Sequence, residues 1–133
     1  MKVLIADDHM VVREGLKQIL KNLCSQYEIE EAKDGNEALH KIKTGYFDFV
    51  ILDISMPGLT GLDILKILKT SNEKVNVLIL SFHPQEQYAI RALRMGASGY
   101  LSKDSAPEEL ANAIKKISAG EKYISSDIIG KLV

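Results

Sequence analysis

The sequence predicts an α/β fold in which a doubly wound parallel sheet of five strands alternates with five helices. Two observations lead to this prediction. Short apolar runs alternate with segments of helical period along the chain. Most of these runs are nearly continuous, as expected for parallel strands that helices cover on both faces. Strict alternation of strand and helix implies right-handed crossovers, and therefore an open doubly wound sheet.

Five segments carry the strand signal. Four strongly apolar runs cover residues 2–6, 47–52, 75–80 and 98–101. A weaker run, residues 27–32, sets Ile29 among glutamates. We expect the weaker run at an edge of the sheet, where one side of a strand remains in contact with water.

Segments of helical period separate the strands. Apolar residues recur every three or four positions, so that each segment has one apolar face. The five faces consist of Val12, Leu16, Ile19, Leu20 and Leu23; Ala38, Leu39 and Ile42; Leu62, Leu65 and Leu68; Ile90 and Leu93; and Leu110, Ile114 and Ile117.

Composition indicates one domain that acts in the cytoplasm. The chain has 133 residues and a hydrophobic content of 46%, enough for a single core without disulfides. Cys24, the only cysteine, is expected to be a small packed side chain in a reducing compartment. No apolar run approaches the roughly twenty residues of a membrane span. With 17 basic and 18 acidic residues and no dense basic stripe, direct binding of nucleic acid by this chain is not expected.

Three aspartates follow strands that should be neighbours. Asp7 and Asp8 end the first strand, and Asp53 ends the third. The functional crevice of an open α/β sheet lies beyond the carboxyl ends of its strands, so these side chains should meet there. Three anions in one pocket repel one another, and a hard divalent cation, most simply Mg²⁺, relieves the repulsion. Taken singly, Asp7 or Asp8 could instead cap a helix, and Asp53 could simply begin a turn.

A hydroxyl and an ammonium group should reach the same edge. Ser81 ends the fourth strand and Lys103 follows the fifth. A phosphoryl group that passes to a carboxylate spreads charge over three equatorial oxygens. Mg²⁺, Lys103 and Ser81 are suited to neutralise that charge while an oxygen of Asp53 attacks. Alone, Ser81 could cap a helix and Lys103 could be solvated; their common edge favours the phosphoryl site.

As a set, these residues resemble the response-regulator receiver domain over about the first 120 residues. The motifs are Asp7-Asp8, Asp53 to Gly58 with Gly61, Ser81, and Gly96 to Leu101 leading to Lys103. The resemblance implies a (βα)5 flavodoxin-like sheet with strand order 2-1-3-4-5. It implies that Asp53 is the phosphoacceptor, that Asp8, Asp53 and the backbone carbonyl of Ser55 hold Mg²⁺, and that Asp7 acts through water. In the family, a hydroxyl at the position of Ser81 and an aromatic at the position of Tyr100 form the switch.

The resemblance extends to a LuxR/NarL-type subgroup. Lys103 is followed by Asp104, where receivers commonly have proline, and Tyr123-Ile124-Ser125 occurs in the tail. Both features are familiar from that subgroup. The subgroup implies that residues 121–133 begin a linker to a C-terminal helix-turn-helix DNA-binding domain that this chain lacks. Without proline, a cis peptide after Lys103 is not asserted.

Two further departures concern the pocket. Ser81 replaces the commoner threonine, and Phe82 stands where the family usually has a small residue. A bulky side chain beside the pocket is expected to hinder a phosphodonor or attacking water.

The implied function is a phosphorylation-dependent switch of a two-component system. Asp53 would accept the phosphoryl group from a sensor histidine kinase, and the full-length protein would control DNA binding and transcription. The chain would be no enzyme beyond its own aspartyl phosphorylation and dephosphorylation. It would contact DNA only through the missing domain, would not bind membranes, and is free to form a homodimer on phosphorylation. Alternatives are an unphosphorylated interaction module and a phosphohydrolase; Ser55 stands where many such hydrolases carry a second aspartate.

Overall fold

A computed structural model of the chain describes residues 1–71, 74–82, 86–126 and 128. Its elements follow one another as β1 (Lys2–Ala6), α1 (Met10–Leu23), β2 (Glu28–Ala32), α2 (Gly35–Thr44), β3 (Phe49–Asp53), α3 (Gly61–Thr70), β4 (Asn76–Ser81), α4 (Glu86–Arg94), β5 (Gly99–Ser102), a 3-10 turn (Lys103–Ser105), α5 (Ala106–Ser118) and β6 (Tyr123–Ile124). All strands pair in parallel, in the order β2-β1-β3-β4-β5-β6. The predicted α/β fold and the order 2-1-3-4-5 are confirmed.

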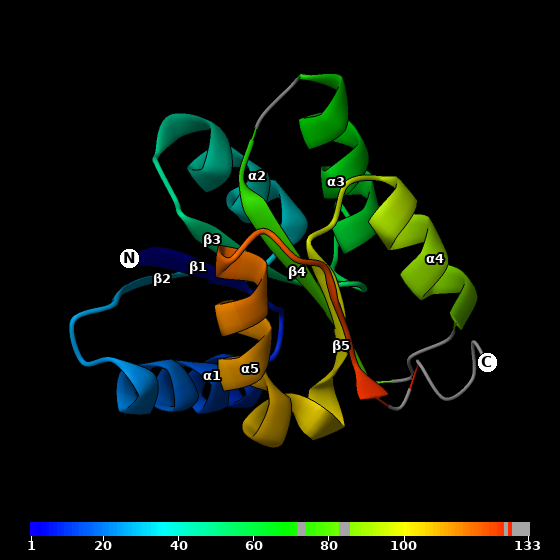
Figure 1. The fold of residues 1–133 in the computed structure, drawn as a ribbon. Coiled ribbons are helices and arrows are strands. Elements are labelled where there is room, and N and C mark those ends of the chain that lie inside the picture. The colour runs from blue at the N-terminus through cyan, green and yellow to red at the C-terminus, as the bar shows by residue number, and fades with distance from the viewer. Residues whose placement is uncertain (72–73, 83–85, 127, 129–133) are drawn as a thin grey trace.

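Helices cover both faces of the sheet (Figure 1). Helices α1 and α5 lie on one face, and α2, α3 and α4 lie on the other. Successive side chains of a strand point to opposite faces. Accordingly, Val3 and Ile5 belong to the core under α1 and α5, whereas Leu4 belongs to the core on the opposite face. Two buried faces explain why the strands read as continuous apolar runs.

Strand β2 lies at one edge of the sheet, as its glutamates predict. Glu28 is exposed, and Ile29 to Glu31 are only partly buried.

Helices α2 and α3 begin at polar caps. The Asp34 carboxylate accepts the Glu37 N–H at the start of α2, and Thr60 and Asp63 form a capping box at the start of α3. Each cap contributes about 1 kcal/mol and fixes where its helix begins.

Two details differ from the sequence prediction. The sheet has a sixth strand, β6, in the segment predicted as linker, and it pairs with β5. The predicted apolar face of α4 is wrong: Ala89 and Ala92 are buried, whereas Ile90 is 38% exposed and Leu93 is half-buried. Small side chains let a helix approach its neighbours closely. Hydrophobicity alone therefore does not reveal which face of α4 is buried.

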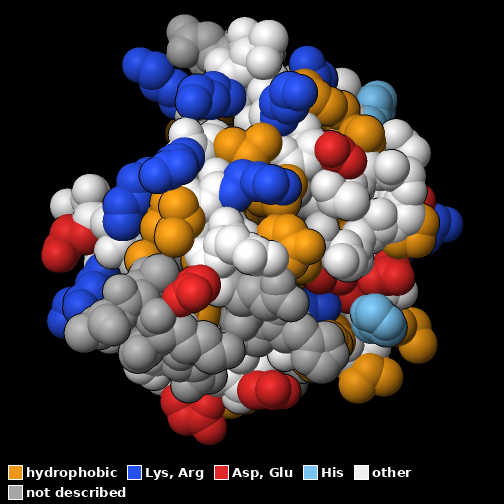
Figure 2. Space-filling view, turned by 90° about the vertical axis from the view of Figure 1, so that its right-hand side faces the viewer, with side chains coloured by type: hydrophobic (Ala, Val, Ile, Leu, Met, Phe, Trp, Pro, Cys, Tyr) orange, Lys and Arg blue, Asp and Glu red, His pale blue; other side chains and the backbone are white. Residues whose placement is uncertain are grey.

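The α4 side of the molecule is therefore both apolar and basic. Figure 2 faces this side and shows hydrophobic side chains interspersed with Lys and Arg. Arg91 and Arg94 lie in the last turn of α4. Within the described ranges, no helix has the length and apolar character to cross a membrane.

Candidate functional site

The carboxyl ends of the central strands form one cleft. Asp7 follows β1, Asp53 ends β3, Ser81 ends β4, and Lys103 follows β5. The cleft has a volume of about 810 Å³, and its described lining is His9, Asp53, Ile54, Ser55, Thr60, Leu62, Ser81, Phe82, Tyr88, Lys103 and Asp104. The register pairs Ser81 with Ser102, so Lys103 enters the cleft one residue beyond the end of β4.

Lys103 is buried between two aspartates. Its Nζ lies 2.6 Å from Oδ2 of Asp7 and 3.2 Å from Oδ2 of Asp53. The side chains of all three residues are no more than 5% exposed. A solvated lysine is excluded, because this ammonium group is removed from water and its compensating charges come from the two carboxylates.

The Asp53 carboxyl group loses its proton less readily than a solvated aspartic acid. Burial raises the pKa of Asp53, and the charge of Asp7 raises it further. Lys103 and the Ser55 N–H, which donates to Oδ1 of Asp53 at 3.2 Å, act in the opposite direction. The net shift of the Asp53 pKa is upward, and burial is its largest cause.

The acidic cluster fits a divalent cation. Ligand atoms of Asp7, Asp8, His9 and Asp53 all lie within 4.8 Å of one another. Asp8 is exposed at the rim, whereas Asp7 and Asp53 are buried. Carboxylate oxygens at this spacing form a hard donor set, and a cation there would relieve the repulsion that raises the pKa of Asp53.

His9 and Arg13 were not predicted as parts of the site. Nδ1 of His9 lies 3.1 Å from Oδ1 of Asp7 and 3.2 Å from Oδ1 of Asp8, although 58% of the His9 side chain is exposed. The structure gives α1 no side-chain cap, which rules out the alternative that Asp7 or Asp8 caps this helix. The Asp7 carboxylate instead accepts the His9 N–H at 2.8 Å.

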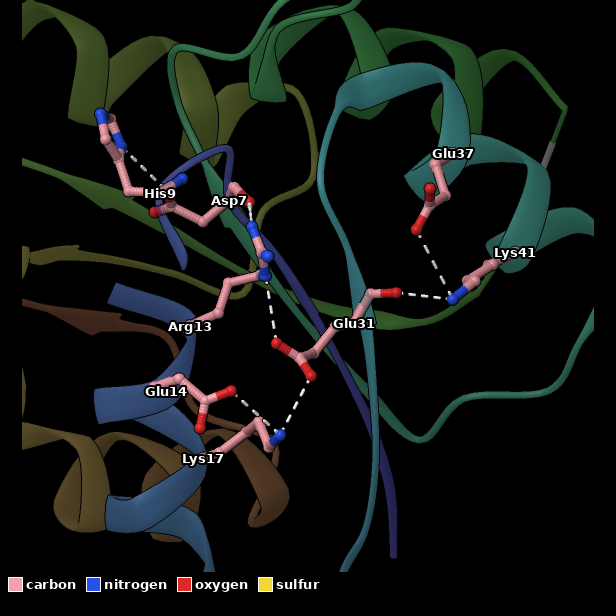
Figure 3. A network of polar contacts seen from close by, with 8 residues as sticks. All are labelled: Asp7, His9, Arg13, Glu14, Lys17, Glu31, Glu37 and Lys41. Atoms are coloured by element: carbon pink, nitrogen blue, oxygen red, sulfur yellow. Dashed lines mark hydrogen bonds and ion pairs between the residues drawn. The ribbon is translucent and has the colours of Figure 1, made fainter. Parts of the chain in front are cut away.

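Arg13 links the site to the edge of the sheet (Figure 3). Its Nη1 donates to the Asp7 carbonyl at 2.7 Å, and its Nε donates to Glu31 at 3.1 Å. Lys17 also binds Glu31, at 3.0 Å. Burial opposes ionisation of Glu31, but these two partners lower its pKa overall. Arg13 thus orients the backbone that carries Asp7, and its position on a largely polar helix face gave no signal of this role.

Close backbone packing shapes the loop after Asp53. A Cβ on Gly61 would lie 2.6 Å from the Asp53 carbonyl oxygen, so only glycine lets α3 begin this near to the site. Gly58 has φ of +82°, which L residues with side chains rarely adopt. Both glycines belong to the motif that the sequence singled out after Asp53.

Ser81 and Phe82 line the cleft, and Tyr100 lies on the neighbouring strand β5. Ser81 and Tyr100 are buried, and the Tyr100 hydroxyl has no hydrogen-bond partner among the described residues. Burial raises the pKa of Tyr100, while the neighbouring Ser81 side chain lowers it. Phe82 is 45% exposed, and Nζ of Lys103 lies 4.6 Å from the centre of its ring. Phe82 therefore holds the same ammonium group that the two aspartates hold. The described residues contain no cis peptide bond.

The fold and the site define a doubly wound α/β domain with an acidic cleft at the carboxyl edge of its sheet, where carboxylate oxygens lie close enough together to hold a metal ion. Comparison with known families gives this class a name, since residues 3–115 match the response regulator receiver domain. The chain belongs to this family.

Individual relatives support the same assignment. The chain is 36% identical over 126 residues to response regulator UvrY of Escherichia coli K12, which covers 95% of the chain and 58% of UvrY. It is 37% identical over 134 residues to oxygen regulatory protein NreC of Staphylococcus carnosus, which covers 100% of the chain and 62% of NreC. The chain thus spans about three fifths of these relatives.

Solved structures agree with the predicted LuxR/NarL-type subgroup. A LuxR-family response regulator from Aurantimonas sp. superposes with a TM-score of 0.89 at 32% identity, covering 97% of this chain and 92% of that one. The receiver domain of NarL from Mycobacterium tuberculosis gives a TM-score of 0.82 at 33% identity, covering 90% and 97%. The resemblance to LuxR/NarL-type receivers is therefore confirmed.

Proposed function

We propose that this chain receives a signal as a phosphoryl group on Asp53, donated by a sensor histidine kinase in the cytoplasm. The observation that carries the proposal is the position of Lys103. Its ammonium group lies within 3.2 Å of the Asp53 carboxylate inside the acidic cleft. This is where an incoming phosphoryl group would place its oxygens, and a buried ammonium group stabilises such charge strongly.

The chemistry follows from the residues at the edge. An oxygen of Asp53 attacks phosphorus, an acyl phosphate bond forms, and the bond from phosphorus to the donor nitrogen or oxygen breaks, so the electron pair leaves with the donor. Lys103 moves its contact from Asp53 to a phosphoryl oxygen, and the Ser81 hydroxyl donates to another. The main contribution of these groups to phosphoryl transfer is to align the reacting atoms. We therefore assign no enzyme activity beyond the chain's own phosphorylation and dephosphorylation.

Mg²⁺ is the proposed cofactor. Asp8, Asp53 and the backbone carbonyl of Ser55 would hold it, with Asp7 acting through water. When bound, Mg²⁺ neutralises phosphoryl oxygens and the charge of the carboxylates. The mutual proximity of the aspartates and the raised pKa of Asp53 support this assignment.

Ser81 and Tyr100 are the proposed switch. A Ser81 hydroxyl drawn toward the phosphoryl group would favour the inward position of the Tyr100 ring, which is fully buried in this structure. Beryllofluoride, which mimics an aspartyl phosphate, should then slow hydrogen exchange around both residues. An unphosphorylated interaction module would show no change.

The rest of the proposed pathway lies outside the chain. In the full-length protein, a C-terminal DNA-binding domain after the linker, residues 121–133, would control transcription, and phosphorylation would allow a homodimer. Solution mass measured with and without beryllofluoride tests the homodimer.

Intact mass spectrometry tests the phosphoryl acceptor. Incubation with acetyl phosphate and Mg²⁺ should add one labile phosphoryl group to the wild type and to Asp104→Asn, which changes an exposed aspartate in the lining of the cleft. Asp53→Asn should gain none. An equal adduct on Asp53→Asn, or no adduct on the wild type, would refute the proposed acceptor.

A further inference from the structure

The segment after α5 is fastened to that helix by one carboxylate. Glu109 accepts hydrogen bonds from the Tyr123 hydroxyl at 2.7 Å, the Ser125 hydroxyl at 2.8 Å and the Ser126 N–H at 3.1 Å. Burial opposes ionisation of Glu109, but these donors and the Ser105 side chain lower its pKa overall. Burial and Glu109 together raise the pKa of Tyr123 to about 12. We call Glu109, Tyr123, Ser125 and Ser126 the clasp.

The clasp is attached directly to the strand that carries Tyr100. Strand β6 pairs Tyr123 with Gly99 and Ile124 with Tyr100. The Ser125 N–H donates to the Tyr100 carbonyl at 2.9 Å. Ser125 is fully buried, although it is polar and close to the end of the described residues. The clasp therefore extends the sheet by one strand beside the proposed switch residue.

The chain just beyond the clasp enters the core cluster that contains Tyr100. The Ile128 N–H donates to the Ser125 carbonyl at 3.0 Å, which sets Ile128 just beyond the clasp. Ile128 is fully buried in the core cluster that contains Tyr100, Ala89 and Ala92. The Tyr100 ring is itself fully buried in this cluster, so its inward position depends on the packing of the residues that cover it.

We propose that Glu109 is a positioning residue for Tyr100, and that the closed clasp and a phosphoryl group on Asp53 favour one another. This inference rests on the proposed phosphoryl acceptor, Asp53. It adds Glu109 to the residues that act on the switch and states that the closed clasp favours phosphorylation. Both features stabilise the same arrangement, in which the Tyr100 ring lies inward. Thermodynamic linkage makes this coupling reciprocal. If the closed clasp raises the affinity for the phosphoryl group by a given factor, the phosphoryl group stabilises the closed clasp by the same factor.

Affinity for beryllofluoride in the presence of Mg²⁺ tests the inference. Titration calorimetry should give Glu109→Ala a dissociation constant about five-fold or more above that of the wild type, within the usual range of coupling between sites. Glu109→Gln should recover part of the loss, because its amide oxygen still accepts from Tyr123. Glu108→Gln, on the exposed neighbouring residue of α5, should match the wild type.

Hydrogen exchange gives the reciprocal measurement. In the wild type, beryllofluoride should slow exchange of the amides of residues 123–126 by a similar factor, and in Glu109→Ala it should not. If Glu109→Ala does not fold, Ser125→Ala removes a single donor and should show a smaller loss in the same direction. Equal affinity in the wild type and a folded clasp variant would overturn the inference alone. Failure of the wild type to bind beryllofluoride would overturn the proposed acceptor as well.

Discussion

The Nζ atom of Lys103 lies 2.6 Å from Oδ2 of Asp7, across 96 positions of the sequence. Both side chains are almost completely buried, so this ion pair joins the end of β1 to the end of β5 inside the core. The attraction is retained only while both partners are present. A buried charge that loses its partner keeps its desolvation cost.

Replacing Lys103 with Met should therefore destabilise the metal-free protein by about 3 kcal/mol, because two buried aspartates lose their counter-charge. Mg²⁺ should recover part of this loss. Urea unfolding with EDTA and with Mg²⁺ measures both values, and Lys115→Met, on the exposed side of α5, is the matched control. An equal loss of stability with and without Mg²⁺ would contradict the view that Lys103 and Mg²⁺ neutralise the same aspartates.

Replacing Asp53 with Asn should stabilise the metal-free protein by about 1 kcal/mol near neutral pH, because the change removes a buried charge that Asp7 repels. The pKa of Asp53 is raised in the folded state above its ordinary value of 3.8. Between the ordinary pKa of 3.8 and the higher pKa of the folded protein, the folded wild type binds the proton more tightly than the unfolded chain does. Its stability therefore falls as pH rises through this window.

The variant lacks this dependence. Its advantage over the wild type should vanish below the window and grow through it, as measured by unfolding at a series of pH values. Asp104→Asn should follow the wild type. If Asp53→Asn is the less stable protein at neutral pH, Lys103 already balances the aspartates.

Replacing Phe82 with Ala should speed phosphorylation by acetyl phosphate several-fold. The ring narrows the cleft and also holds the Lys103 ammonium group, an interaction worth about 0.5–1 kcal/mol. Phe82→Leu separates the two effects, because leucine keeps bulk but lacks the aromatic face. If the cation–ring contact restrains Lys103, both variants should react faster than the wild type. If the bulk of the side chain alone matters, only Phe82→Ala should react faster. Unchanged phosphorylation rates in both variants would exclude a role for Phe82.

Replacing Tyr100 with Phe should stabilise the resting protein by about 1 kcal/mol, because the change removes a buried hydroxyl without a partner among the described residues. Thermal unfolding measures the difference, and Tyr46→Phe, at an exposed tyrosine, should change nothing. A loss of stability would mean that the Tyr100 hydroxyl is paired with Ser81.

The sequence predicted the fold, and the meeting of four side chains at one edge of the sheet, because both depend on position along strands. Parallel strands bring their carboxyl ends to one edge, so knowing that Asp7, Asp53, Ser81 and Lys103 follow strands was enough to bring them together. The order of the strands came only from the resemblance, because periodicity carries no information about which strands are neighbours.

Features that depend on packing distance were missed. The buried face of α4 consists of alanines, and the larger Ile90 points outward, so a search for large apolar residues selected the wrong face. Strand β6 has only two residues, too few for a periodic signal, and it depends on hydrogen bonds to Glu109 that no local pattern reveals. Arg13 and His9 act through the backbone and rim of the site, where sequence spacing gives no indication of contact.

Borohydride trapping tests the central claim most directly. Borohydride reduces an aspartyl phosphate to homoserine, so peptide mass spectrometry locates the phosphorylated position. After treatment with acetyl phosphate and Mg²⁺, we predict homoserine at residue 53 and unchanged aspartate at residues 7 and 8. Homoserine at residue 7 or 8, or at none of the three after a confirmed phosphoryl adduct, would contradict the assignment of Asp53 as the acceptor.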